Sequence, residues 1–265
     1  MTLTVGSLFS GIGGLDLGLE RAGMKVIWQS EIDPFACKVL KKHWPGVPNH
    51  GDIKQIDWDT VERPDIICGG YPCQPFSLAG QRNGTDDPRH LWPWVRECIS
   101  RLQPRYAILE NVRGHLTLGG LQVIGELAEI GYDAEWRIVP ASGVGAYHRR
   151  DRIIIVAYPN SQGLQRRTKT ENSKRENSKG HLGPSCSNLA NASGIRGAGW
   201  RGAFASDNAE VRQHAIRSAA YWEVEPAVGR MADGVSHRMD RLRGLGNAVV
   251  PQVAEYIGRL ITTIG

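Results

Sequence analysis

Short apolar runs alternate with longer amphipathic stretches over the first 158 residues of the chain. The run Ile153-Ile154-Ile155-Val156-Ala157 is apolar at every position, which is typical of a strand covered by helices on both faces. Such runs predict strands over residues 3–8, 25–30, 65–69, 106–110, 135–140 and 152–158, and the stretches between them predict helices over 14–22, 34–43, 88–102 and 118–130. This alternation indicates an α/β fold built on a doubly wound parallel sheet.

The pattern changes after residue 158. Residues 160–202 are rich in Asn, Ser, Gly and Arg and poor in aliphatic side chains, so they cannot form much core alone. Order is expected to return at 222–228, and apolar positions at helical spacing predict a closing helix over 248–261. We therefore expect a main domain over 1–158, an insert over 159–221, and a return into the main domain over 222–265.

Positive charge is concentrated in the insert. The 265 residues have a net charge of +5, and residues 160–220 hold ten Lys or Arg against four acids, so this segment carries +6 and the remainder about −1. A basic segment favours a nucleic-acid partner, although a solvated loop fits the charge equally well. No apolar run approaches the ~20 residues of a membrane span. The start lacks a secretory signal, and the cysteine spacing shows no disulfide or metal-binding pattern, so we expect a reducing cytoplasm.

The turn after the first predicted strand, Phe9-Ser10-Gly11-Ile12-Gly13-Gly14, is rich in glycine. Glycines there let a ligand approach the backbone at a helix N-terminus. The spacing misses the dinucleotide pattern, since position 16 is Asp, which disfavours a nicotinamide-dependent oxidoreductase and suits a nucleoside cofactor without a pyrophosphate. Glu31 and Asp52 are candidates to bind ribose hydroxyls; a helix cap or a surface carboxylate is the alternative for each.

A cysteine follows the third predicted strand, in Gly70-Tyr71-Pro72-Cys73-Gln74-Pro75-Phe76-Ser77. Open α/β sheets place their ligands at the carboxyl ends of strands, and the flanking prolines stiffen the backbone around Cys73. Cys73 is therefore a candidate nucleophile. An ordinary cysteine in a tight turn is the alternative.

Glu110 closes the next buried strand, in Glu110-Asn111-Val112. A carboxylate there is costly unless it is paired or used. Because the two strands are expected to be neighbours, Glu110 should lie beside Cys73 at the carboxyl edge of the sheet. A salt bridge to Arg113 or Arg105 is the alternative.

A basic cluster, His148-Arg149-Arg150-Asp151-Arg152, leads into the last predicted strand. Side chains alternate along an extended segment, so Arg150 and Arg152 should share one side of it. Two guanidiniums aimed at one cleft suit a phosphate, a thiolate or a base carbonyl. A basic strand edge without a ligand is the alternative.

Taken in this order, the motifs resemble those of the DNA (cytosine-5) methyltransferase family. The Pro-Cys-Gln and Glu-Asn-Val pair is the most specific part, and the matching segments are 9–14, 72–74, 110–112, 150–152 and 246–251, with Glu31 and Asp52. There are two departures. Tyr147-His148 stands where the family often has Pro-Gln, and the segment in the place of the target-recognition region, 159–221, is short.

The resemblance implies a Rossmann-like fold that uses S-adenosylmethionine, with a small basic target-recognition insert. It implies an enzyme that methylates carbon 5 of a cytosine flipped out of duplex DNA, through a covalent adduct with Cys73. The implied catalytic residues are Cys73, Glu110, Arg150 and Arg152. Cofactor contacts are expected at Phe9, Gly11, Ile12, Gly13, Gly14, Glu31, Ile32, Asp52, Ile53, Gly70, Pro72, Leu91, Asn247 and Ala248, and DNA contacts at Gln81, Arg82, Arg166, Arg167, Arg196 and Arg201.

Two alternatives stay open beside this interpretation. One is the same chemistry on a transfer RNA, and the other is a DNA-binding protein without activity. For the main interpretation we expect a monomer without a metal, acting on double-stranded DNA and not on a membrane. A cognate restriction endonuclease is a candidate partner.

Overall fold

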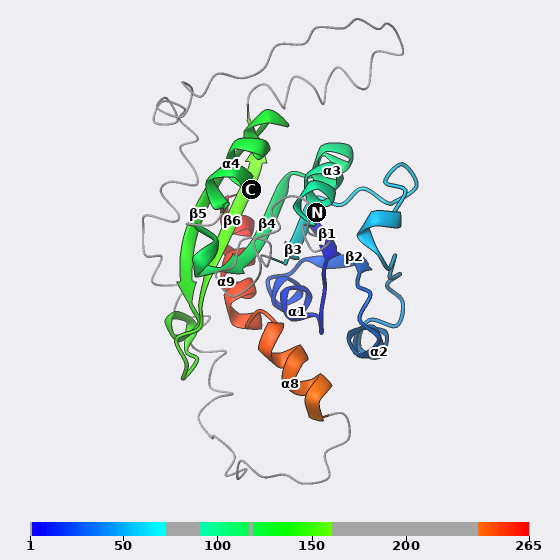
Figure 1. Ribbon diagram of the computed structural model, residues 1–265, viewed down its shortest axis with the longest axis vertical. Helices are drawn as coiled ribbons and strands as arrows, with labels where there is room; N and C mark the ends of the chain where they lie inside the picture. The colour runs from blue at the N-terminus through cyan, green and yellow to red at the C-terminus, as the bar shows by residue number, and fades with distance from the viewer. Residues whose placement is uncertain (1, 73–90, 117–118, 161–237, 265) are drawn as a thin grey trace, which may run out of the picture.

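The structure, a computed structural model, describes residues 2–72, 91–116, 119–160 and 238–264 (Figure 1). Six strands form one sheet in the order β2-β1-β3-β4-β6-β5. They are β1 (Thr4–Leu8), β2 (Lys25–Ser30), β3 (Ile66–Gly70), β4 (Tyr106–Val112), β5 (Tyr132–Pro140) and β6 (Asp151–Pro159). All six predicted strands are confirmed, and the largest boundary difference is at the start of β5, which begins at Tyr132 and not at 135.

The sheet is mixed, so the prediction of a wholly parallel sheet is wrong for β6. Strands β1 to β4 pair in parallel, whereas β6 is antiparallel to both of its neighbours, β4 and β5. The connection between β5 and β6 covers only residues 141–150 and includes the short helix η5 (Ala141–Val144). A parallel return needs a crossover of roughly a dozen or more residues, whereas a shorter connection can join antiparallel strands.

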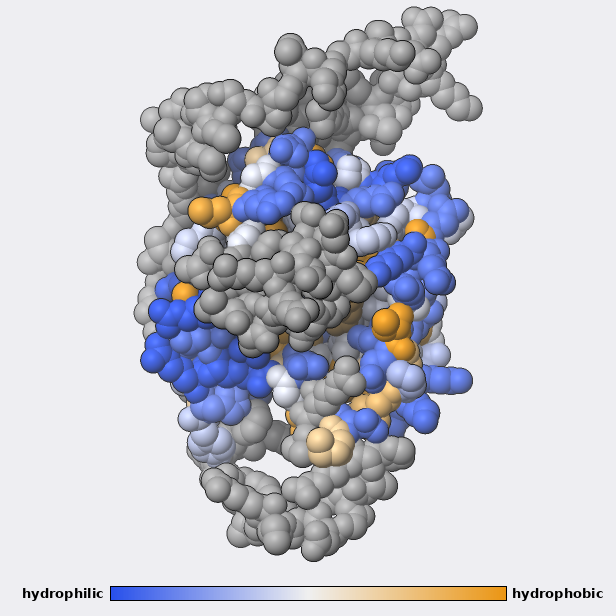
Figure 2. All heavy atoms as spheres, in the orientation of Figure 1, coloured by the Kyte–Doolittle hydropathy of each residue, from blue (hydrophilic) through white to orange (hydrophobic). Residues whose placement is uncertain are grey.

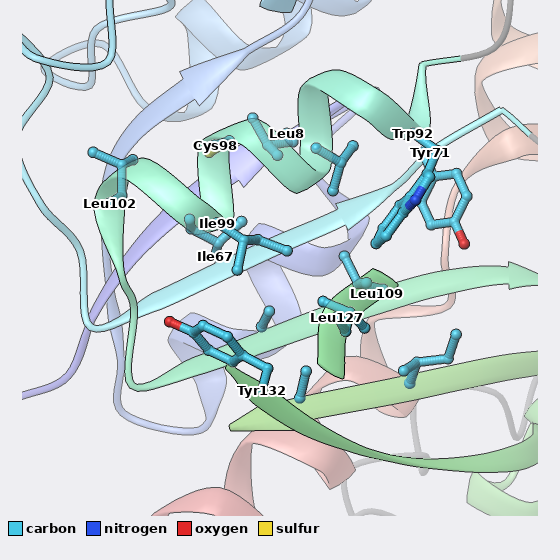
Figure 3. Packing of buried hydrophobic residues seen from close by; sticks show 14 of the residues in the cluster. Leu8, Ile67, Tyr71, Trp92, Cys98, Ile99, Leu102, Leu109, Leu127 and Tyr132 are labelled. Carbon is cyan, nitrogen blue, oxygen red and sulfur yellow. The ribbon is translucent and has the colours of Figure 1, made fainter. Parts of the chain in front are cut away.

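Helices cover both faces of the sheet, as a doubly wound arrangement requires. Successive strand residues point to opposite faces: Ile66 and Cys68 of β3 pack in the cluster that contains α1 and α9, and Ile67 packs in the cluster that contains α3 and α4. Figure 3 shows this second cluster. The described helices are α1 (Gly14–Arg21), α2 (Pro34–His43), α3 (Trp92–Leu102), α4 (Gly120–Glu129), α8 (Arg238–Asn247) and α9 (Pro251–Ile264), with short η1 (Ile53–Gln55) and η4 (Arg113–Leu116).

The predicted helices occur with small differences at their ends. Helix α2 has the predicted bounds, because the Asp33 carboxylate accepts hydrogen bonds from the N–H groups of Phe35 and Ala36 and Pro34 occupies the first helical position. Helix α3 begins at Trp92, and residues 88–90 of its predicted range lie outside the described residues. The closing helix is α9, shifted by three residues from 248–261 to Pro251–Ile264. Most of the expected insert and the stretch 222–228 also lie outside them.

Helix α9 packs closely on α1, and two glycines make this possible. A Cβ on Gly18 would lie 2.2 Å from the Pro251 carbonyl oxygen, and one on Gly14 would lie 2.4 Å from the Val249 carbonyl oxygen. Side chains at these positions would therefore push the two helices apart. The C-terminal segment is thus held against the glycine turn of the first strand.

The described surface on the face drawn in Figure 2 is mostly hydrophilic, with small scattered hydrophobic areas. Among the described helices, none combines the length and the apolar character that a membrane crossing needs. The described residues also contain no cluster of three or more His, Cys, Asp or Glu side chains suited to a metal ion.

Candidate active site

The ends of four parallel strands bring the predicted residues to one edge of the sheet. The strand register pairs Leu8 with both Ser30 and Gly69, and Gly70 with Glu110. The glycine turn, Glu31, the segment that leads to Pro72, and Glu110 therefore follow neighbouring strand ends. This is the edge at which open α/β sheets bind ligands.

The glycine turn has the backbone geometry of a ligand-binding loop. Phe9, Gly11 and Gly13 have φ values of 50°, 56° and 83°, and Gly13 precedes α1 without a side-chain cap. A helix N-terminus without a side-chain cap presents N–H donors to a ligand. A Cβ built on Gly11 would come no closer than 3.9 Å to the Phe9 carbonyl oxygen, an ordinary van der Waals distance, so the described residues leave room beside Gly11.

The Glu31 carboxylate joins the glycine turn to the end of β2. Its Oε2 accepts a hydrogen bond from the Gly11 N–H at 2.7 Å, and its Oε1 accepts from the N–H groups of Ile32 and Asp33, each at 2.8 Å. The side chain of the neighbouring Ile32 is 68% exposed and lies open to a ligand. A carboxylate and an open apolar side chain together suit the ribose and the base of a nucleoside.

Asp52 and Ile53 have structural roles of their own in the free protein. The Asp52 carboxylate accepts a hydrogen bond from the Lys54 N–H at 3.0 Å and caps η1, as the alternative interpretation for this acid proposed. The Ile53 side chain is buried in the cluster that contains α3 and α4. Leu91 is half-buried and precedes α3 as its cap residue.

Glu110 forms a buried ion pair with Arg152. The Arg152 Nε lies 2.7 Å from the Glu110 Oε1, and Glu110 is 7% exposed. Across the antiparallel ladder Arg152 pairs with Val112, two residues beyond Glu110, so both side chains lie on one face of the sheet. The expected alternative partners are wrong: Arg113 pairs with Asp151, at 3.4 Å.

The Glu110 carboxyl is confined by its neighbours, and opposing effects act on its pKa. Burial raises its pKa, while the charges of Arg152 and Arg150 act in the opposite direction. A Cβ on Gly70 would lie 2.7 Å from the Glu110 Oε2, so only glycine leaves room for the carboxyl in this position. Gly70 therefore contributes to the site because its missing side chain leaves space for the Glu110 carboxyl.

Arg150 is oriented differently from Arg152. Its φ is 36°, so the backbone is not extended at this residue and the expected alternation of side chains does not apply. The Arg150 Nη2 donates to the carbonyl oxygens of Gly246, at 2.5 Å, and Ala248, at 2.6 Å. Arg150 therefore holds the segment that includes Asn247, while its charge still acts on Glu110.

A buried network under the glycine turn was not expected from the sequence. The Asp16 carboxylate is fully buried and accepts hydrogen bonds from the Ser7 hydroxyl at 2.9 Å and the Gln29 Nε2 at 2.8 Å. The Ser10 hydroxyl in turn lies 3.0 Å from that of Ser7. Burial raises the pKa of Asp16 to about 6, while these hydrogen bonds lower it. The sequence signal that could have predicted this network is the position of Asp16, an acid on the apolar side of α1.

Several predicted site residues lie outside the described part of the chain. They are Cys73, Gln81, Arg82, Arg166, Arg167, Arg196 and Arg201. The structure ends one residue short of Cys73, at the exposed Pro72. The predictions for these residues stay predictions.

Comparison with known proteins defines the class of this chain. A solved structure described as a DNA modification methyltransferase encoded within an E. coli prophage matches with a TM-score of 0.52 and 30% identity, over 62% of this chain and 48% of that one. The six-stranded α/β architecture is thus that of a Rossmann-like methyltransferase fold. The family model of C-5 cytosine-specific DNA methylases matches residues 3–225. The chain belongs to this family.

Curated relatives of this chain include Type II methyltransferases. Type II methyltransferase M.BsuFI of Bacillus subtilis is 34% identical over 167 residues, which cover 61% of this chain and 41% of the relative. Type II methyltransferase M.NgoMIV of Neisseria gonorrhoeae is 34% identical over 165 residues, which cover 60% of this chain and 53% of the relative. The chain spans about half or less of the length of these relatives.

Proposed function

We propose that this protein is a DNA (cytosine-5-)-methyltransferase that acts on a cytosine flipped out of duplex DNA. The observation that carries the proposal is the buried Glu110–Arg152 pair at the carboxyl edge of the sheet, next to the segment that leads into Cys73. Membership of the cytosine-specific methylase family supports it. Its expected location is the cytoplasm, where DNA is accessible, and a cognate restriction endonuclease is a proposed partner.

The residues around the glycine turn fit S-adenosylmethionine. This cofactor contains a nucleoside without a pyrophosphate, and the turn offers an uncapped helix N-terminus, room at Gly11 and the Glu31 carboxylate. We expect Glu31 and Asp52 to bind the ribose and Ile32 to cover the base. Asn247 and Ala248 would close the site from the C-terminal side, held by Arg150. When bound, S-adenosylmethionine supplies an electrophilic methyl group and leaves as S-adenosylhomocysteine.

Cys73 would act as the nucleophile. Its thiolate forms a bond to carbon 6 of the cytosine, and the electron pair of the ring double bond becomes available at carbon 5. After methylation, loss of the carbon 5 proton and of the thiolate restores the ring. The sulfur is thus returned unchanged at the end of each cycle.

Glu110 would hold the proton that this attack requires. In its protonated form the carboxyl donates a hydrogen bond to the ring nitrogen and neutralises the negative charge that develops there. Its burial favours the protonated form, as the raised pKa indicates. Arg152, paired with Glu110, orients the carboxyl and is placed to contact the base.

DNA binding is proposed to involve the parts of the chain beyond this edge. Carbon 5 and carbon 6 cannot be reached inside a stacked duplex, so the cytosine must leave the helix, which costs a few kcal/mol. We propose that Gln81 and Arg82, with Arg166, Arg167, Arg196 and Arg201 in the basic insert, contact the DNA and offset part of this cost.

A covalent trapping experiment tests the proposal. Duplex DNA with 5-fluorocytosine at target sites should become covalently bound to the wild-type protein in the presence of cofactor, because fluorine replaces the carbon 5 hydrogen whose loss would release the protein. The variant Cys73→Ser should form no adduct and transfer no methyl group, yet bind cofactor. The control Cys98→Ala, which removes a buried thiol in α3, should keep both activities. Methyl transfer by Cys73→Ser, or transfer to transfer RNA alone, would contradict the proposal.

A further inference from the structure

Tyr71, two residues before Cys73, is fixed at both its side chain and its backbone. The Tyr71 hydroxyl lies 2.7 Å from the His115 Nε2, and the Tyr71 carbonyl oxygen accepts a hydrogen bond from the Asn111 Nδ2 at 3.1 Å. The ring is 5% exposed and packs against Trp92 and His115, each with a centroid distance of 5.4 Å. Figure 3 shows Tyr71 against Trp92 at one end of the cluster.

The partners of Tyr71 come from three elements that surround the site. Asn111 belongs to β4 and follows Glu110 directly, His115 lies in η4, and Trp92 begins α3. Trp92 is itself held, since its Nε1 donates to the Glu126 Oε2 of α4 at 2.7 Å. Tyr71 is therefore fixed relative to the strand that provides Glu110.

The peptide bond between Tyr71 and Pro72 is fixed together with the Tyr71 side chain. Gly70 is paired with Glu110 in the sheet, and Asn111 holds the peptide between Tyr71 and Pro72. Consecutive Cα atoms are about 3.8 Å apart, and the proline ring restricts rotation of the chain at Pro72. The peptide that leads toward Cys73 is therefore held relative to the strand that provides Glu110.

The burial of His115 costs free energy that an apolar side chain of similar size would not cost. The side chain is 2% exposed, and its Nδ1 is buried without a hydrogen-bond partner among the described residues. Burial lowers the pKa of the imidazole, so the neutral ring is favoured. Replacing both members of a buried polar pair by apolar groups of similar shape is often neutral or stabilising. Orientation of Tyr71, and not stability, is then what the histidine provides.

We propose that the Tyr71 hydroxyl and the His115 imidazole form a positioning pair that sets the place of the Cys73 sulfur relative to the Glu110 carboxyl. This inference rests on the proposed methyltransferase function. Neither residue contacts the reacting atoms, so both act through the peptide that leads into Cys73. Their loss should slow the chemical step without weakening the binding of cofactor or DNA.

Single-turnover methyl transfer at saturating DNA and cofactor tests the pair. Tyr71→Phe and His115→Leu should each slow transfer by roughly ten- to a hundredfold, since small misplacements of reacting groups have effects of this size. The double variant should be no slower than the slower single variant, because the two side chains act as one unit. His115→Gln, which can place an amide near the position of Nε2, should restore part of the rate. The dissociation constants of cofactor and DNA should change less than twofold.

A matched control separates positioning from stability. Tyr132→Phe removes another buried tyrosine hydrogen bond, 2.8 Å to the Pro104 carbonyl oxygen, near the opposite edge of the sheet. It should lower the melting temperature at least as much as the double variant Tyr71→Phe/His115→Leu, yet leave the transfer rate unchanged. Rates that follow the melting temperature in all variants, or effects of the two single variants that multiply in the double variant, would overturn the proposal.

A second measurement does not depend on methyl transfer. The alkylation rate of Cys73 by iodoacetamide, followed by peptide mass spectrometry, should differ more than threefold from wild type in Tyr71→Phe and His115→Leu, and return toward it in His115→Gln. If the wild type transfers no methyl group, the proposed function fails, and this altered alkylation still supports the positioning pair. Equal alkylation rates in all variants would overturn the pair, whatever the activity.

Discussion

The buried Asp16 makes a sharp prediction about the stability of the fold. The substitution Asp16→Asn keeps the shape of the side chain and the acceptor for Gln29, and the Ser7 hydroxyl can reverse its role and accept from the new amide. The change removes the ability to ionise in a fully buried place, and the cost of the new amide N–H groups is the same at every pH. The difference in stability between the two proteins should therefore depend on pH.

The size of the effect follows from the pKa of Asp16, which burial raises from 3.8 to about 6. A carboxyl with a raised pKa in the folded state stabilises the fold while it is protonated. Its contribution is full below pH 3.8 and is lost as the pH rises through about 6. One pKa unit corresponds to about 1.4 kcal/mol, so the complete effect is about 3 kcal/mol. Between pH 5 and pH 8 the wild type should lose about 1.4 kcal/mol relative to Asp16→Asn.

Urea denaturation followed by tryptophan fluorescence at pH 5, 6, 7 and 8 measures this difference directly. A companion variant, Ser7→Ala, removes a hydrogen bond that lowers the pKa of Asp16, so its midpoint of pH dependence should move to higher pH. The free energy of unfolding of Asp16→Asn relative to wild type should rise with pH mainly below pH 7, around the raised pKa of Asp16, and level off above it. A constant difference across this range would show that the pKa of Asp16 is not raised in the folded protein and would refute the reasoning.

Two further predictions concern the site. Glu110→Gln should slow methyl transfer by at least ~100-fold. The wild-type rate should fall as the pH rises through the raised pKa of Glu110, because the carboxyl then loses its proton, and this limb of the pH–rate profile should be absent in the variant. Arg150→Ala removes the hydrogen bonds to Gly246 and Ala248 and should weaken cofactor binding about tenfold, the effect of roughly 1.4 kcal/mol; calorimetric titration with S-adenosylmethionine would contradict this role if the affinity were unchanged.

The elements of the fold could be predicted because their signals are local. The apolar run at Ile153–Ala157 identifies β6 without any knowledge of its neighbours, and Asp33 with Pro34 marks the start of α2. The direction of β6 could not be read in the same way, since an apolar run fits either direction equally well. Only the short connection over 141–150 limits the choice, and its length was available in the sequence.

The sequence indicated several residues of the site, but it did not indicate which of them contact each other. Glu110 was expected to need a partner because it ends a buried strand, yet Arg152 became that partner through the antiparallel register, which the expected parallel sheet excluded. Arg150 could not be placed because a positive φ interrupts the strand entry. The contact between Tyr71 and His115 joins residues 44 positions apart and depends on where η4 lies after β4.

The C-terminal segment, residues 238–264, contributes to the proposed cofactor site through its contacts with α1 and Arg150. Gly14 and Gly18 of α1 allow Val249 and α9 to lie against the glycine turn, and Arg150, at the entry to β6, fixes the carbonyl groups just before α9. The proposed cofactor site is therefore completed only when residues 238–264 return to the first strand. The two described elements on either side of residues 161–237, β6 and α8, are joined by Arg150, which donates to the Gly246 carbonyl oxygen at the end of α8.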